Sequence, residues 1–264
     1  MAQLKRGVVC TLVSGDEARN LSIYSVPLMK KYATRIKADF VELNPSELEY
    51  SRGPHYEKFQ IRQLLEKYER VIFFDVDTLI TPHAPNLFNV VNKSVLGVVN
   101  VSKIFNSLSN EISAVKQVFN FELDGKQYFN SGVMVVSQEH RSLFDDKSQQ
   151  LTKWIDAKKR GLRCLNDQTY LNYYAQYLNV TLFNLGRAYN YTRAWGGFHK
   201  KYQKYIIHYA GLKEVRGQLM KRDSMVISNA TLFNLFSTFP FITYTFDRVS
   251  HYLLRPITAV WLRK

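Results

Sequence analysis

Two acidic side chains separated by one residue, Asp75 and Asp77, directly follow an apolar run in the segment VIFFDVDTLI. Side chains two residues apart in an extended segment point to the same side, so both carboxylates would face one site. Two carboxylates held close together repel each other unless a proton or a cation lies between them. Oxygen ligands suit hard divalent cations such as Mn²⁺ and Mg²⁺. The pair therefore predicts a metal site where a buried strand ends.

Two other interpretations of this pair stay open on these residues alone. Asp75 and Asp77 could cap the next turn, because DTLITP contains good turn-forming residues. Alternatively, FDVDT resembles the nucleophile motif DxDGT of haloacid-dehalogenase-like phosphatases, in which Asp75 would be the nucleophile. Here the glycine of that motif is missing, and two expected strands precede the motif, whereas those enzymes usually carry it on their first strand. We therefore rank the phosphatase below the metal site.

Three further segments follow the acidic pair in order: YFNSGVMVVS, LNDQTYLN and IIHYAGLKE. Together with FFDVDTLI they resemble the motif set of family 8 glycosyltransferases, which includes glycogenin and bacterial lipopolysaccharide glycosyltransferases. The resemblance runs from about Val8 to Lys213, and four motifs in the family's order are far more specific than any one of them. It implies a single α/β domain of the GT-A type, a nucleotide-diphospho-sugar transferase with a mixed, mostly parallel sheet flanked by helices.

The resemblance also assigns the metal ligands and the phosphate contacts. In that family two aspartates and a histidine bind Mn²⁺, which bridges the phosphates of a UDP-sugar; the matching positions are Asp75, Asp77 and His208. Mixed carboxylate and imidazole ligands suit Mn²⁺ better than Mg²⁺, which remains the alternative metal. Gly211 and Lys213 match the family's diphosphate-gripping loop, where a glycine lets the backbone approach a phosphate closely.

The rest of the donor pocket follows from the same resemblance. The first strand and its loop would flank uracil and ribose, a lysine before the acidic pair would lie near the phosphates, and the FNSG and NDQ segments would contact the donor sugar. The residues so assigned are Thr11, Leu12, Val13, Asp16, Lys58, Val76, Asn130, Ser131, Gly132, Asp167 and Gln168.

Three of these assignments have local alternatives. Lys58 could be a solvated helix cation, and Asn-Ser-Gly could form a turn before the strand VMVV. Asn166 or Asp167 could cap a helix through TYLNYYAQYL. Under the resemblance, Asp167 and Gln168 would instead lie beside the anomeric carbon, and with Lys213 they are the predicted catalytic residues.

The reaction that the resemblance implies is transfer of a hexose from UDP-glucose or UDP-galactose to a hydroxyl of a glycan, glycolipid or protein acceptor. The anomeric configuration would be retained, and UDP would leave. Metal and Lys213 would stabilise the charge that develops on the diphosphate. Retention could arise by double displacement through an enzyme nucleophile or by front-face attack, and the sequence does not choose between them.

The elements that must position these residues are indicated by short apolar runs alternating with amphipathic segments, a pattern typical of α/β proteins. A crossover helix is expected in EKFQIRQLLEKYER, where Phe59, Leu64, Leu65 and Tyr68 recur at near-helical spacing. Ligands bind at the carboxyl ends of strands in open α/β sheets, which is where the acidic pair falls. The expected strands are Val8 to Val13, Phe40 to Leu43, Val71 to Phe74, Val95 to Val99, Val133 to Val136 and Tyr205 to His208.

The positive charge of the chain is concentrated toward its end. Of a net charge of +14 over 264 residues, the stretch from Arg187 to Lys264 carries 13 Lys and Arg against 3 Asp and Glu. We expect a catalytic domain over residues 1–215 and a basic, aromatic C-terminal extension over 216–264. The extension would dock on an anionic membrane or a charged glycolipid acceptor, or it would fold onto the core as helices. Nucleic-acid binding ranks lowest, because no binding motif accompanies the charge.

The cysteines and the first residues bear on the compartment. Cys10 and Cys164 lie far apart with no CxxC spacing, which argues against a disulfide scaffold, a zinc site or a redox motif. The N-terminal run GVVCTLV is too short for a signal peptide, and no stretch reaches the roughly 18 apolar residues of a spanning helix. We therefore expect a cytoplasmic protein whose C-terminal extension makes any peripheral membrane contact.

Overall fold

The computed structural model describes residues 4–45, 53–104 and 107–253. A six-stranded sheet forms its centre, in the order β2-β1-β3-β6-β5-β7. Strand β6 is antiparallel to both neighbours, whereas the pairs β1–β2, β1–β3 and β5–β7 are parallel, so the sheet is mixed and mostly parallel, as expected. The strands are β1 (Val8–Leu12), β2 (Asp39–Leu43), β3 (Arg70–Phe74), β5 (Leu96–Asn100), β6 (Phe129–Ser137) and β7 (Leu182–Asn184).

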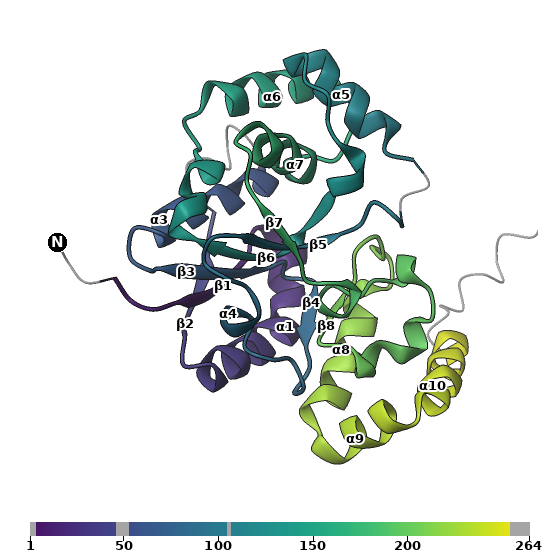
Figure 1. Ribbon diagram of the computed structural model, residues 1–264. Coiled ribbons are helices and arrows are strands. Elements are labelled where there is room, and N and C mark those ends of the chain that lie inside the picture. Colours follow the sequence, from purple (N-terminus) through teal and green to yellow (C-terminus); the bar gives the residue numbers. More distant parts are fainter. Residues whose placement is uncertain (1–3, 46–52, 105–106, 254–264) are drawn as a thin grey trace, which may run out of the picture.

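Helices cover both faces of this sheet. Figure 1 shows helix α1 on one face and helices α5, α6 and α7 on the other. Every residue of β3 is buried, as the apolar run before the acidic pair predicts. The helices that flank the sheet are α1 (Gly15–Arg35), α4 (Leu87–Val90), α5 (Ser109–Phe119), α6 (Gln149–Lys159) and α7 (Asp167–Tyr177).

A second, two-stranded sheet differs from the sequence expectation. Strand β4 (Thr78–Ile80) pairs antiparallel with β8 (Ile206–His208), so the strand expected at Tyr205 to His208 lies outside the main sheet. Neither β4 nor β7 was expected, because each has only three residues and shows no alternation of its own. The β4–β8 pairing matters for the site, since it sets Thr78 opposite His208.

The crossover segment is not one continuous helix. Residues Pro54–Gln60 form a 3₁₀ helix, labelled η1, and helix α3 covers only Ile61–Leu64. In 3₁₀ geometry side chains three residues apart lie on the same side. Tyr56 and Phe59 therefore point together into the core, with ring centroids 6.4 Å apart, while His55 and Lys58 both line a pocket at the other side. Of the residues whose spacing predicted one α-helix, Phe59 lies in this 3₁₀ helix and Leu64 ends α3.

The C-terminal extension forms helices that pack onto the rest of the chain as far as the structure describes it. Met220 and Val226 of α8 and Phe233 of α9 join Leu21 of α1 in one apolar cluster. No helix of the described residues is both long and apolar enough to cross a membrane. The helices are α8 (Arg216–Ser228), α9 (Ala230–Thr238) and α10 (Pro240–Leu253), and the remaining 3₁₀ helices are η2 (Gly125–Gln127), η3 (Gln138–Phe144), η4 (Arg187–Tyr189), η5 (Arg193–Trp195) and η6 (Phe198–Gln203).

Candidate metal centre and adjoining pocket

Asp75, Asp77 and His208 meet at the carboxyl end of β3. Each offers one ligand atom, and the three atoms lie within 4.8 Å of one another. His208 Nε2 lies 3.1 Å from Asp77 Oδ1 and 3.9 Å from Asp75 Oδ2. The β4–β8 pairing brings the histidine here, and the Tyr209 amide donates a hydrogen bond to the Asp77 carbonyl at 3.0 Å. Two carboxylates and an imidazole are a donor set that suits Mn²⁺.

A buried asparagine orients the histidine. His208 Nδ1 lies 2.7 Å from Asn190 Oδ1, so a proton on Nδ1 donates to the amide and the ring directs Nε2 toward the carboxylates. The amide nitrogen of Asn190 donates to Asn130 Oδ1 at 2.6 Å. Asn190 is 1% exposed, and the neighbouring Tyr191 bridges to Ile207 of β8. Sequence analysis missed Asn190, because no motif that we identified contains it.

Gly132 leaves the space that the ligands occupy. A Cβ atom at this position would lie 2.5 Å from His208 Cε1, 2.6 Å from Asp75 Oδ2 and 2.9 Å from Asn130 Oδ1. All three distances are shorter than real Cβ contacts. The Asn-Ser-Gly segment is also part of β6 and does not form a turn before it. Glycine is therefore required at position 132, because any side chain there would displace the ligands. The three side chains Asp75, Asp77 and His208 fit a divalent metal.

The two aspartates differ in their electrostatic surroundings. Burial raises the pKa of Asp75. Burial acts on Asp77 in the same direction, but the neighbouring His208 and the Arg216 guanidinium outweigh it and lower the pKa of Asp77. Arg216 Nη1 lies 3.2 Å from Asp77 Oδ2. This arginine begins helix α8, beyond the motifs, so sequence analysis gave no reason to place it in the site.

Lys58 is buried and is not a solvated helix cation. Its ammonium group lies 2.8 Å from Asp167 Oδ2 and 3.2 Å from Asp75 Oδ1, and its side chain is only 6% exposed. It also donates to Ser131 Oγ at 3.2 Å. Burial by itself would lower the pKa of Lys58, but Asp167 and Asp75 outweigh burial and raise it. Lys58 therefore stays charged and joins the acidic pair to the start of α7.

Asp167 and Gln168 begin helix α7 and face the same pocket. Asp167 Oδ2 accepts from Lys58 and from Ser131 Oγ at 2.9 Å; although burial opposes it, Lys58 lowers the pKa of Asp167. Gln168 Oε1 accepts from Asn130 Nδ2 at 2.8 Å, whereas its buried Nε2 has no hydrogen-bond partner in the described part of the chain. Asn166 occupies the cap position of α7, but its side chain accepts no capping hydrogen bond there.

These side chains surround a pocket of about 590 Å³. The predicted residues that line it come from the first strand, η1, the acidic pair, β6, α7 and the loop after β8. The pocket is also lined by residues that sequence analysis did not predict. The predicted lining residues are Leu12, Lys58, Asp75, Val76, Asp77, Ser131, Asp167, Gln168 and Lys213, and the additional ones are Ser14, Glu17, Ala18, Leu21, Pro54, His55, Cys164, Leu165, Asn166 and Arg216.

The other predicted residues lie around this lining. Thr11 and Val13 are buried on either side of Leu12. Asp16 is exposed and pairs with Arg19, while Glu17 lines the pocket. Gly211 has a φ of +75°, which favours glycine and turns the chain before Lys213.

Comparisons with known proteins show the family and the fold of the chain. The profile of Glycosyl transferase family 8 matches residues 17–214. The fold is similar to that of a glycosyltransferase involved in the glycosylation of the major capsid of PBCV-1, with a TM-score of 0.58 and 12% identity, covering 82% of this chain and 99% of that one. It is also similar to the galactosyltransferase LgtC solved in complex with donor and acceptor sugar analogs, with a TM-score of 0.55 and 13% identity over 84% of this chain and 97% of that one.

A third solved structure, the bifunctional glycosyltransferase WbbM, matches with a TM-score of 0.53 and 15% identity over 80% of this chain and 46% of that one. A search of curated proteins finds no match. At these identities the solved structures show the shared fold, and the family profile, which covers more than half of the chain, shows the family. The chain belongs to glycosyl transferase family 8.

Proposed function

We propose that this glycosyltransferase is metal-dependent and retaining, and that it moves a hexose from UDP-glucose or UDP-galactose to a hydroxyl of a glycan, glycolipid or protein acceptor. The observation that carries the proposal is the Asp75, Asp77 and His208 cluster at the edge of a pocket of about 590 Å³. A pocket of this volume is in the range that holds small ligands and cofactors. The family assignment favours this function over the phosphatase and nucleic-acid alternatives.

Asp75, Asp77 and His208 would hold Mn²⁺, or Mg²⁺ as the alternative. Bound there, the ion supplies positive charge against the diphosphate of the leaving UDP. Lys213 lines the same pocket, and its exposed side chain belongs to the loop that turns at Gly211. An ammonium group beside the diphosphate would stabilise the charge that develops as the glycosidic bond breaks.

Arg216 is a second cation for the diphosphate. It pairs with Asp77 and lines the pocket, and its buried Nε has no hydrogen-bond partner in the part of the chain that the structure describes. An arginine presents its donors in a planar fork that matches phosphate oxygens. In HYAGLKEVRG, Glu214 directly follows Lys213, and Arg216 adds a second basic side chain two residues after this acid.

Gln168 and Asp167 would act at the donor sugar. The unpartnered Nε2 of Gln168 can donate to a sugar hydroxyl, because its Oε1 is already held by Asn130. The lowered pKa keeps Asp167 ionised, and its hydrogen bonds with Lys58 and Ser131 both use Oδ2. An ionised carboxylate here would stabilise positive charge at the anomeric carbon or attack that carbon, so trapping of a glycosyl-enzyme adduct on Asp167 distinguishes double displacement from front-face attack.

The deciding experiment measures UDP release from a panel of UDP-sugars with and without Mn²⁺. We expect metal-dependent release by the native chain and a loss of about 100-fold in Asp77→Asn, because a charged ligand of the metal is removed. The matched control is Asp39→Asn, which alters an exposed aspartate paired with Lys5 at the sheet edge. Release that survives Asp77→Asn unchanged contradicts the metal site, and hydrolysis of simple phosphomonoesters without a nucleotide sugar would favour the phosphatase.

The C-terminal helices are proposed to contact an anionic membrane from the periphery. They expose large apolar side chains, including Met225 at 64% and Phe241 at 66%, in the most basic part of the chain. Basic surfaces with exposed apolar groups bind anionic bilayers by charge and shallow burial. Sedimentation with vesicles tests this membrane contact, and the chain is expected to bind vesicles that contain phosphatidylserine more than neutral ones. Equal binding to both kinds of vesicle, or binding to neither, contradicts the contact.

A further inference from the structure

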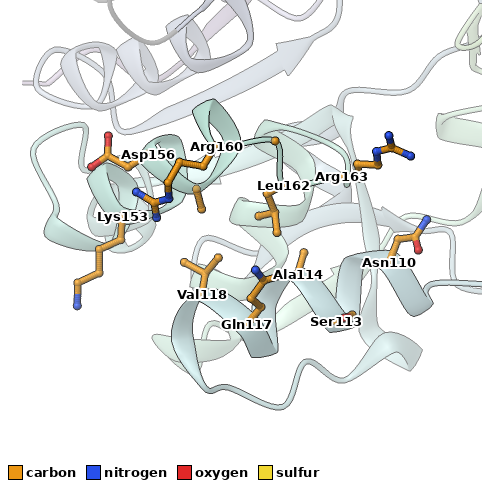
Figure 2. Close-up of a pocket in the computed structure, with 12 residues that line it drawn as sticks. Asn110, Ser113, Ala114, Gln117, Val118, Lys153, Asp156, Arg160, Leu162 and Arg163 are labelled. Carbon is orange, nitrogen blue, oxygen red and sulfur yellow. The ribbon is translucent and has the colours of Figure 1, made fainter.

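A second pocket, of about 680 Å³, lies between helices α5 and α6 (Figure 2). Helix α5 contributes Asn110, Ser113 and Gln117, which recur at the spacing of one helix face. The facing stripe of α6 contains Lys153, and Arg160 follows directly after the helix at the same kind of spacing. Two packed helices usually bury apolar side chains against each other, so polar stripes on both facing surfaces leave a hollow that is open to solutes.

The lining of this pocket is basic. Lys153, Arg160 and Arg163 supply three cations, against Asp156 as the acidic side chain of the lining. In the described part of the chain none of these four side chains forms an ion pair or hydrogen bond, in contrast to the paired cations of the donor pocket. Figure 2 shows Lys153, Asp156 and Arg160 on the α6 side and Arg163 near Asn110 at the other end. Uncompensated positive charge around a hollow attracts anions.

The loop that carries the two arginines is held in place by the end of α6. Gly161 has a φ of +94°, its amide donates to the Lys158 carbonyl at 3.0 Å, and the Leu162 amide donates to the Ala157 carbonyl at 3.1 Å. These two bonds form a Schellman motif, which ends a helix in a defined geometry. Lys158 Nζ also donates to the Cys164 carbonyl at 2.7 Å. Arg160 and Arg163 therefore project from a fixed turn.

The same loop separates this pocket from the donor pocket. Arg163 lines the pocket between α5 and α6, and the next residue, Cys164, lines the donor pocket, as do the following residues up to Gln168. Consecutive Cα atoms are about 3.8 Å apart. The two pockets therefore share this loop as a common wall, and a saccharide seated in the α5–α6 pocket would lie against the side of that wall that faces away from the donor sugar.

We propose that the α5–α6 pocket binds a phosphate group carried by the acceptor saccharide. The inference rests on the proposed glycosyltransferase function and names the class of its acceptor. Arg160 and Lys153 on the α6 side would bind the phosphate, because guanidinium and ammonium groups form charge-assisted hydrogen bonds with it. Arg163, at the other end of the pocket beside Asn110, would bind a sugar hydroxyl. The amide and hydroxyl groups of α5 would bind sugar hydroxyls, and Ala114, Val118 and Leu162 supply an apolar floor for the sugar ring.

The test is binding of glucose 6-phosphate, followed by calorimetry without nucleotide or metal, so that it does not depend on the donor site. Glucose 6-phosphate is expected to bind the native chain more tightly than either glucose or inorganic phosphate. In the double variant Arg160→Ala/Arg163→Ala the affinity is expected to fall by about tenfold or more, because charge-assisted hydrogen bonds are lost. The matched control is Lys147→Ala/Lys159→Ala, which removes two exposed charges nearby but outside the lining and is expected to bind within about twofold of native.

Five outcomes overturn the inference, and the first four concern glucose 6-phosphate alone. The native chain fails to bind glucose 6-phosphate, the arginine variant binds it as tightly as the native chain, or the lysine control loses as much affinity as the arginine variant. In the fourth outcome UDP displaces glucose 6-phosphate, which would place this ligand in the donor pocket. Inorganic phosphate binding as tightly as glucose 6-phosphate would reduce the pocket to a general anion site and also contradict the proposal. Both arginines are exposed, so circular dichroism is expected to show the variant folded like the native chain.

Discussion

Gly132→Ala is expected to disable the metal site while leaving the backbone able to fold. Gly132 lies in β6 and is not among the glycines with positive φ, so alanine is compatible with its backbone. The added Cβ would lie 2.5 Å from His208 Cε1 and 2.6 Å from Asp75 Oδ2, whereas ordinary contacts begin at 3.4 Å. Two ligands must therefore move by roughly 0.8 to 0.9 Å, several times the tolerance of about 0.2 Å on metal–ligand distances. We expect Mn²⁺ affinity to fall about 100-fold, or about 2.7 kcal/mol.

The assay is a Mn²⁺ titration followed by electron paramagnetic resonance, with thermal unfolding measured on the same samples. The control is Gly217→Ala in α8, where the added Cβ would meet only Leu21 Cδ2, at 3.9 Å. Replacing glycine by alanine inside a helix usually stabilises it by about 0.5 to 1 kcal/mol. A folded Gly132→Ala variant that binds Mn²⁺ within twofold of the native chain would refute the idea that this glycine makes room for the ligands.

Three other substitutions separate positioning of the site from stability of the fold. Asn190→Ala should weaken Mn²⁺ binding about 10- to 100-fold, because the ring of His208 is released. Asn190→Asp keeps an acceptor oxygen and should lose less affinity. Equal Mn²⁺ affinity in both variants and the native chain would argue against a role of Asn190 in orienting His208. Lys58→Met leaves buried carboxylates without their cation. The free energy of unfolding, measured in urea, should therefore fall by about 3 to 5 kcal/mol. A fall below about 1 kcal/mol would show that the pairing of Lys58 with these carboxylates contributes little to stability. Burial alone would raise the pKa of Asp223, but the buried Lys201 beside it lowers this pKa below the ordinary 3.8. The ionised carboxylate therefore stabilises the fold above about pH 3.8. This contribution is lost as the pH falls through the pKa of Asp223 in the folded state. Thermal unfolding from pH 6 to pH 2.5 should therefore show a shallower acid-induced loss in Asp223→Asn than in the native chain, and parallel curves would count against the coupling.

The features that sequence analysis predicted well are local ones. The run VIFF predicts a buried strand, and β3 is buried throughout, so the position of Asp75 and Asp77 at its end follows from neighbouring residues. The order of the motifs predicts the family, which the profile match confirms. Helix α7 likewise begins at Asp167, where the capping residues of LNDQ indicate a helix start. In each case the information lies within a few residues of the feature itself.

The features that sequence analysis missed depend on contacts between distant segments. Asn190 orients His208 because a loop bridges to β8, and the sequence around YNYT gives no sign that this amide is buried. Arg216 reaches Asp77 because α8 folds back against α1, which a count of basic residues does not reveal. For Lys58, the family resemblance predicted a place near the phosphates, but the local pattern alone also allowed a solvated helix cation, because it does not show the 3₁₀ turn that directs this side chain inward.

We propose that Asp75, Asp77 and His208 hold a divalent metal against the diphosphate of a UDP-sugar. Calorimetric titration of the native chain with UDP, in Mn²⁺ and separately in EDTA, tests it most directly. We expect UDP binding in Mn²⁺ that weakens about 100-fold or more in EDTA, since the ion would supply much of the charge that faces the phosphates. UDP affinity that is the same in Mn²⁺ and in EDTA would show that no metal at these three residues holds the diphosphate.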